Sequence, residues 1–275
     1  MNTIRPPAVA GLFYPAEAAL LQSTVDQLLG DALVQTAKST HPAQQPKALI
    51  VPHAGYIYSG STAARAYAEL APWRHSIHRV ILLGPTHRVA VNGLALPETD
   101  TFATPLGKIP VDPAARAAII DLPQICSSDR VHAQEHSLEV HLPFLQRGLD
   151  DFTLLPLAVG EASPEDVAEV IDRLWGGPET LFVISSDLSH FLPYATAQAV
   201  DRKSCGKILA LDTTLHPEQA CGAFPINGLL LAARQRGLQP RQLALCNSGD
   251  TAGERSRVVG YASFALYEPN ESHHG

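Results

Sequence analysis

The sequence has little of several residue types, and each scarcity excludes a class of protein. Among 275 residues there are one Met, two Trp and four Cys, and 20 Lys and Arg stand against 27 Asp and Glu, a net charge of −7. Binding of nucleic acid through bulk positive charge is excluded, because it requires a basic surface. The 45% share of apolar residues excludes a chain of low-complexity disorder.

Long apolar runs are also missing. The apolar stretches at 48–51 and 80–83 are far shorter than the roughly 20 residues of a membrane-spanning helix. The first residues, MNTIRPP, lack the apolar centre of a signal peptide, and the four cysteines include no CxxC pair. We therefore expect no membrane contact, a cytoplasmic location and free thiols.

Short apolar runs alternate with amphipathic helical patterns along the chain. Most of the runs lack polar alternation, which is typical of strands buried on both faces. The alternation predicts a single α/β domain over residues 1–275, a three-layer αβα sandwich with a mostly parallel central sheet. The strand candidates are 48–51, 80–83, 153–157, 181–185, 242–246 and 258–266, and the helix candidates are 18–33, 61–70, 137–148, 164–175, 196–211 and 226–237.

Histidine is abundant, with 12 residues, and some of them follow strand candidates directly. His53 follows the run at 48–51, His87 follows 80–83, and Asp187 and His190 follow 181–185. Ligands of open α/β sheets bind beyond the carboxyl ends of parallel strands, so we expect these four side chains at one sheet edge. A single loop histidine would more often bond a neighbouring backbone group. The hypothesis of a functional site therefore depends on all of them together.

A second polar cluster carries Glu135, His136 and His141. The spacing of five between the two histidines does not place them on one helical face, which excludes an HEXXH zinc motif. Glu135, His136 or His141 could instead form a hydrogen bond to a metal-bound imidazole. The alternative is a helix N-terminus capped by Ser137, and the sequence leaves both interpretations open.

Several other residues have ordinary structural explanations. Cys221 lies at a break between two helical patterns, and its spacing alone favours a structural thiol. Arg88 fits an anionic substrate or a surface ion pair equally well. Ser185 and Ser186 keep a metal-free hydrolase open as an alternative, although the chain has no GxSxG elbow. It also has no Walker A loop and no GxGxxG after its first strand, so no nucleotide site is indicated.

Six segments in one order give the sequence a family resemblance over nearly its whole length. They are RPPAVAGLFYP at 5–15, VPHAGYIYSG at 51–60, LGPTHR at 83–88, EHSLEVHLPF at 135–144, SSDLSH at 185–190 and CGAFPI at 221–226. In these motifs the chain resembles the Memo-like proteins, whose prokaryotic members are called AmmeMemoRadiSam system protein B. The resemblance implies a fold similar to that of class III extradiol dioxygenases, which carry non-haem Fe(II).

The resemblance also implies roles for particular residues. His53, His87 and Cys221 match the metal-site positions, and Asp187 and His190 line the same pocket. Fe(II) is the expected metal, while a thiolate ligand would also suit Cu or Zn. His190 is the expected acid or base, with Asp187 orienting it or binding substrate.

Two functions follow as expectations from this resemblance. The first is a metal-dependent oxidoreductase related to the dioxygenases, acting on a small molecule that the sequence does not identify. The second is a non-catalytic metal-binding or interaction module that uses the same pocket. The family's prokaryotic name further implies a radical-SAM protein and an AMMECR-type protein as partners.

Overall fold

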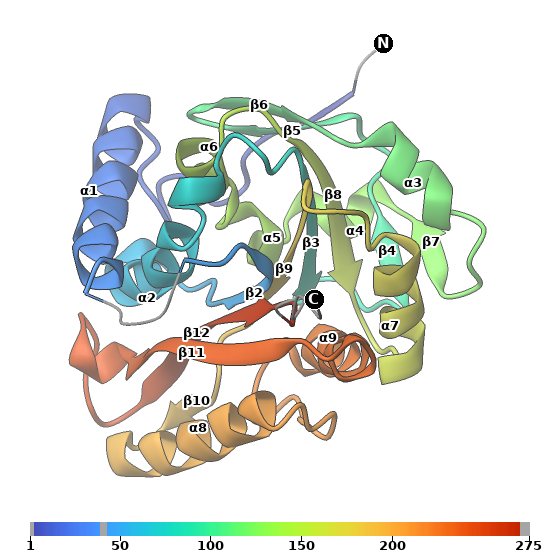
Figure 1. The fold of residues 1–275 in the computed structure, drawn as a ribbon. Helices are drawn as coiled ribbons and strands as arrows, with labels where there is room; N and C mark the ends of the chain where they lie inside the picture. Colours follow the sequence, from blue (N-terminus) through green and yellow to red (C-terminus); the bar gives the residue numbers. More distant parts are fainter. Residues whose placement is uncertain (1–2, 39–42, 270–275) are drawn as a thin grey trace, which may run out of the picture.

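A large mixed sheet forms the centre of the fold in the computed structural model, which describes residues 3–38 and 43–269 (Figure 1). The strands lie in the order β10-β12-β2-β9-β3-β8-β4-β7, and β11 pairs antiparallel with residues 260–267 of β12. The strands are β2 (Pro46–Val51), β3 (Arg79–Pro85), β4 (Leu94–Leu96), β7 (Ile125–Ser127), β8 (Thr153–Val159), β9 (Thr180–Ser185), β10 (His190–Leu192), β11 (Gln239–Asn247) and β12 (Val258–Tyr267).

The four central strands, β2, β9, β3 and β8, run parallel. Each is buried along almost its full length, which is why these segments read as continuous apolar runs. The outer strands differ, because β12 is antiparallel to β2 and β4 is antiparallel to β8. The predicted α/β class is therefore confirmed, with a parallel centre and antiparallel margins.

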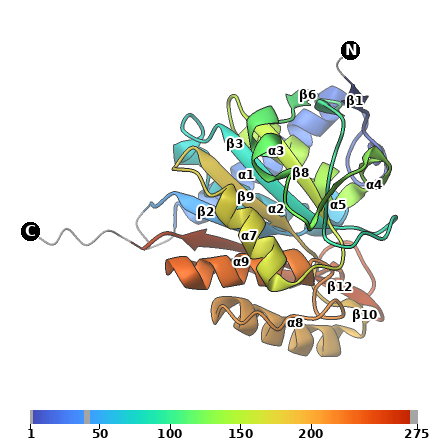
Figure 2. The ribbon, with the colours of Figure 1, turned by 90° about the vertical axis from the view of Figure 1, so that its right-hand side faces the viewer.

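Helices pack on both faces of this sheet (Figures 1 and 2). One group is α1 (Ala18–Thr36), α2 (Tyr56–Ala68) and α6 (Leu142–Gly148), and another is α7 (Pro164–Arg173) with α9 (Ala223–Arg236). The helix α8 (Tyr194–Leu209) packs against β11 and β12. No helix within the described ranges is both long enough and apolar enough to cross a membrane.

Shorter elements lie around this framework. A small sheet joins β1 (Ile4–Arg5), β5 (Thr101–Thr104) and β6 (Gly107–Pro110). The remaining helical segments are α3 (Pro113–Ile119), α4 (Asp129–Ala133), α5 (His136–Glu139) and the 3₁₀ turns η1 (Ala71–Trp73) and η2 (Ser248–Asp250).

Four of the six predicted helices agree with the structure to within three residues at each end, and two differ more. The helix expected over 137–148 is divided into α5 and α6, because Pro143 lacks the N–H that would continue the helical ladder to Glu139. The helix expected from residue 61 begins earlier, at Tyr56. Gly60 lowers helix propensity in that turn, but it lies close to α1, where an added Cβ would be 3.0 Å from Cδ1 of Leu28. Packing between α1 and α2 therefore outweighs propensity.

The segment before α1 is tied to the interior through one buried carboxylate. Glu139 is fully buried, pairs with the buried Arg5 and accepts the hydroxyl of Tyr14. It also accepts the backbone N–H groups of Ala8 and Val9. These bonds satisfy the buried charge and place residues 8–14 beside α5, next to the carboxyl edge of the sheet.

Candidate metal centre

Parallel strands deliver several of the predicted site residues to one edge. Val51 at the end of β2 pairs with Ser185 at the end of β9, and Leu83 of β3 pairs with Ile184. The loops that follow these strands carry His53, Asp187 and His87. The rings of His53 and His87 lie 5.2 Å apart, in an edge-to-face arrangement.

His136, on α5, completes a cluster with these two histidines. One ring nitrogen from each of His53, His87 and His136 lies within 4.8 Å of the others. The ring of His136 is 4.6 Å from that of His87 and 5.4 Å from that of His53. This convergence suits a metal ion, for which neutral imidazole is the commonest protein ligand. From the sequence, His136 was expected to hydrogen-bond a metal-bound imidazole and not to belong to the cluster itself.

Ser185 fixes the ring of His53. Its buried hydroxyl donates to the carbonyl of Ser137 at 2.6 Å, so it must accept from Nδ1–H of His53, also at 2.6 Å. The lone pair of His53 is therefore on Nε2. The same bonding leaves Ser185 no free proton for use as a nucleophile, which argues against the metal-free hydrolase.

Glu135 fixes the ring of His87 and approaches that of His136. It lies 2.9 Å from Nδ1 of His87 and 3.3 Å from Nδ1 of His136, and it accepts the backbone N–H of His87. It also caps α5 through the N–H groups of His136 and Ser137. Glu135 is thus both the N-cap of α5 and the carboxylate in contact with the imidazoles. The expected cap, Ser137, does not cap this helix.

The electrostatic environment of this cluster favours the binding of a cation. Burial lowers the pKa of His53 far below its usual range, and the neighbouring histidines lower it further. Burial lowers the pKa of His136 to about 4, although Glu135 opposes the effect. Burial alone would raise the pKa of Glu135, but hydrogen bonds from His87 and Ser137 hold it at about 2. His53 and His136 are therefore neutral lone-pair donors beside a negative carboxylate.

Cys221 borders the cluster immediately before α9. Its Sγ lies 3.5 Å from Nε2 of His53 and accepts the backbone N–H of Asp187 at 3.3 Å. Burial, followed by the charge of Asp187, raises the pKa of the Cys221 thiol to about 12. A Cβ at Gly222 would meet the carbonyl oxygen of Ser185 at 2.5 Å, so glycine is what allows this approach.

Asp187 and His190 occupy different positions in the site. The buried carboxylate of Asp187 accepts the backbone N–H of His53 at 2.8 Å and shapes that loop. Burial raises the pKa of Asp187 to about 7. His190 is half-buried at the start of β10 and bonds the backbone of Leu188, while burial lowers its pKa. His87 is close enough to add to this lowering, so His190 lies near the cluster.

His141 lies deeper than its neighbours in the 135–144 motif. It is fully buried, and its Nδ1 shares a hydrogen bond of 2.9 Å with the hydroxyl of Tyr67 on α2. Its Nε2 has no hydrogen-bond partner. The bond to Tyr67 gives His141 a place in the packing between α2 and α6.

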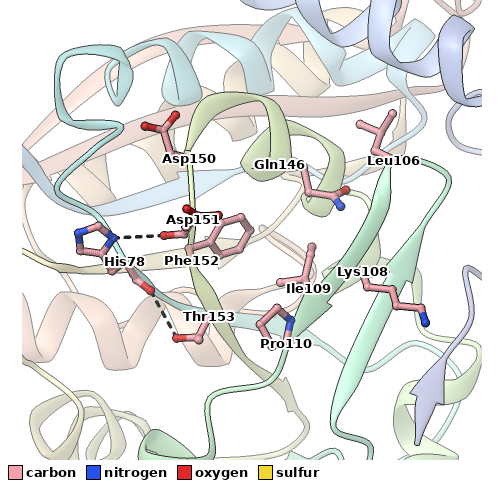
Figure 3. Close-up of a pocket in the computed structure, with 10 residues that line it drawn as sticks. All are labelled: His78, Leu106, Lys108, Ile109, Pro110, Gln146, Asp150, Asp151, Phe152 and Thr153. Atoms are coloured by element: carbon pink, nitrogen blue, oxygen red, sulfur yellow. Dashed lines mark hydrogen bonds between the residues drawn. The ribbon is translucent and has the colours of Figure 1, made fainter. Parts of the chain in front are cut away.

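A separate cavity of about 550 Å³ lies at the opposite edge of the sheet (Figure 3). His78 and Thr153, at the amino ends of β3 and β8, line it together with Phe152 and Ile109. The Nδ1 of His78 is bonded to the carbonyl of Asp151. This cavity therefore does not belong to the histidine cluster, which lies beyond the carboxyl ends of the same strands.

Comparisons with known proteins agree over almost the whole chain. Residues 5–265 match the family model described as Memo-like protein. A MEMO1 family protein of Sulfolobus acidocaldarius is 34% identical, over 94% of this chain and 98% of its own length. Those of Aquifex aeolicus and Aeropyrum pernix are 34% and 35% identical, again over 94% of this chain and over 97% and 98% of their own lengths.

A solved structure shows a similar fold. The crystal structure of uncharacterized protein JW3007 from Escherichia coli K12 has a TM-score of 0.50 and 14% identity, over 79% of this chain and 98% of the other. At that identity, the likeness concerns the fold alone.

Proposed function

Since the chain belongs to the Memo-like protein family, we propose that it binds a transition-metal ion at His53 and His87 and uses it in oxidation–reduction chemistry. The observation that carries the proposal is the bonding of the rings. Ser185 and Glu135 hydrogen-bond the Nδ1 atoms of His53 and His87, and one ring nitrogen of each of these two residues lies within 4.8 Å of a ring nitrogen of His136. Imidazoles whose other nitrogen is hydrogen-bonded in this way are typical of metal ligands.

Two residues compete to be the third ligand. Cys221 matches the family's position and lies beside His53, but its thiol must lose a proton to bind a metal. His136 is already neutral and lies within the cluster. We propose Cys221 as the anionic ligand, with the N–H of Asp187 stabilising its thiolate, and His136 as an additional imidazole.

Fe(II) is the metal we propose, and Cu or Zn also suits imidazole and thiolate donors. When bound, the metal would supply redox or Lewis-acid chemistry at the sheet edge. His190 would move a proton there, because it is half-buried, lies near His87 and has a lowered pKa. Asp187 would hold the His53 loop and keep Cys221 in place.

Elemental analysis of anaerobically purified protein tests the site. We expect about one metal ion per chain in the wild type, consistent with a single closed cluster. His53→Ala and His87→Ala should lose it, while His78→Asn at the opposite edge should keep it. Cys221→Ser and His136→Asn separate the two candidates for third ligand. Full occupancy in both His53→Ala and His87→Ala would overturn the assignment.

Oxygen uptake by the metal-loaded protein distinguishes an oxidoreductase from a protein that binds metal without catalysis. Metal-dependent uptake with a reduced organic substrate, lost in His190→Gln, would support the oxidoreductase. Bound metal without any such turnover would favour the non-catalytic metal-binding or interaction module. Copurification with radical-SAM and AMMECR-type proteins would then be the next measurement.

A further inference from the structure

Phe191 has a backbone conformation that bulky residues rarely adopt. Its φ is 59°, and the pairing of β10 with β12 shifts register between His190 and Leu192, so Phe191 is the extra residue of a bulge. Bulges beside active sites redirect neighbouring side chains, and this one lies immediately after His190. Glycine or asparagine would adopt the same φ at lower cost.

The side chain of Phe191 is also poorly buried. It is 60% exposed, although Phe normally contributes to a protein through its buried area. Its recorded neighbours are the ring of His190 at 5.8 Å and the guanidinium of Arg257 at 5.1 Å. Folding therefore gives no reason for a large apolar ring at this strained position, immediately after a residue of the proposed site.

Two exposed arginines lie near residues of the proposed site, in a chain whose net charge is −7. Arg257 lies over Phe191, and Arg88 follows His87 directly and is close enough for its charge to act on His136. Among the described residues, neither arginine forms an ion pair. The guanidinium of Arg257 beside an exposed ring suits a ligand that is both anionic and apolar.

We propose that Phe191 and Arg257 bind the substrate, and that the substrate is a small organic anion with an apolar body. The body would pack on the open face of Phe191 and the anionic group would bind Arg257, with Arg88 adding to the local positive potential. The reacting part would then face His190. This inference rests on the proposed metal-dependent function, because it gives that site its class of substrate.

Calorimetric titration of metal-free protein tests the inference separately from metal binding. The probes are benzoate, phenyl phosphate, uncharged benzyl alcohol and inorganic phosphate. We expect one of the first two to bind at least about tenfold more tightly than either of the others, because only they combine both features. The comparison of benzoate with phenyl phosphate shows which anionic group the site prefers. Absence of binding by both up to about 10 mM would overturn the proposal.

Three variants assign the binding to these residues. Arg257→Gln and Phe191→Gly should each weaken binding of the better probe about tenfold or more. Phe191→Gly should also raise the thermal midpoint, since glycine removes the backbone strain, so its loss of binding would not reflect unfolding. Arg241→Gln is the matched control, because Arg241 lies over Tyr267 at the other end of β12. Equal effects of Arg257→Gln and Arg241→Gln would contradict the proposal.

Discussion

At the scale of single residues, the site depends on which nitrogen of each histidine carries its proton. A neutral Ser185 sets this for His53, whereas the charged Glu135 sets it for His87 and approaches His136. The sequence showed His53 and His87 because apolar strands lead into them. It did not show the role of Ser185, since a buried serine at a strand end has no distinctive pattern.

Removal of the Ser185 hydroxyl should weaken metal binding without unfolding the protein. In Ser185→Ala, Nδ1–H of His53 loses its acceptor and the ring can change tautomer or rotate. We expect metal affinity to fall about 10- to 100-fold, as for other residues that orient a ligand. Competition with a chelating dye measures it.

Ser263→Ala is the control for Ser185→Ala. Ser263 is fully buried on β12, and its hydroxyl has no hydrogen-bond partner. Its removal should leave metal affinity within about twofold, because no ligand depends on it. Equal affinity in Ser185→Ala and Ser263→Ala would show that Ser185 does not orient His53.

At the scale of elements, long buried segments were predictable and short ones were not. The central strands, six or seven residues long, were found because each contains an apolar run with almost no polar alternation. The capping of α7 by Ser163 also follows from local sequence. In contrast, β4 and β7 have three residues each and form only because β8 offers an edge. Cys126, which reads as a loop residue, lies in β7.

The place of His136 in the histidine cluster was not predictable for a similar reason, because it depends on contacts between distant parts of the sequence. His136 reaches the cluster because Ser137 on α5 is bonded to Pro85 of β3 and to Ser185 of β9. These contacts join residues about 50 positions apart, and no local spacing encodes them. Tertiary bonds of this kind therefore decide which motif histidine faces the site and which one, like His141, faces the core.

The N-terminal segment should be held mainly by its buried ion pair. Arg5→Met leaves Glu139 charged and buried without its cation, which typically costs about 3–5 kcal/mol. Arg147→Gln removes an exposed pair with Asp26 and should cost about 0–1 kcal/mol. Urea unfolding of both variants measures the difference. Similar midpoints for the two would mean that Glu139 is satisfied by Tyr14 and the backbone alone.

At the scale of the whole molecule, stability should depend on pH through buried histidines. Burial lowers the pKa of His132 to about 4, although its bond to the Ala95 carbonyl opposes this, and burial lowers that of His141 to about 3. In the unfolded chain, His132 and His141 become protonated near pH 6.5. The stabilisation is therefore complete above pH 6.5 and is lost as pH falls towards 4, at about 1.4 kcal/mol per pH unit for each histidine.

Urea unfolding of metal-free protein between pH 7 and pH 4.5 measures this slope. His132→Gln should remove about 1.4 kcal/mol per pH unit from the slope, whatever its effect on stability at pH 7. His78→Asn, at the surface near the Figure 3 cavity, should keep the full slope. A wild-type protein whose stability is constant over this range would contradict the burial of neutral imidazoles.

The central claim is that the carboxyl edge of the sheet holds a metal between His53 and His87. Anomalous diffraction from crystals grown anaerobically with Fe(II) tests it most directly. The account predicts one strong anomalous peak in contact with Nε2 of both histidines. A peak elsewhere, such as beside His78 at the opposite edge, with none at the histidine cluster, would contradict it.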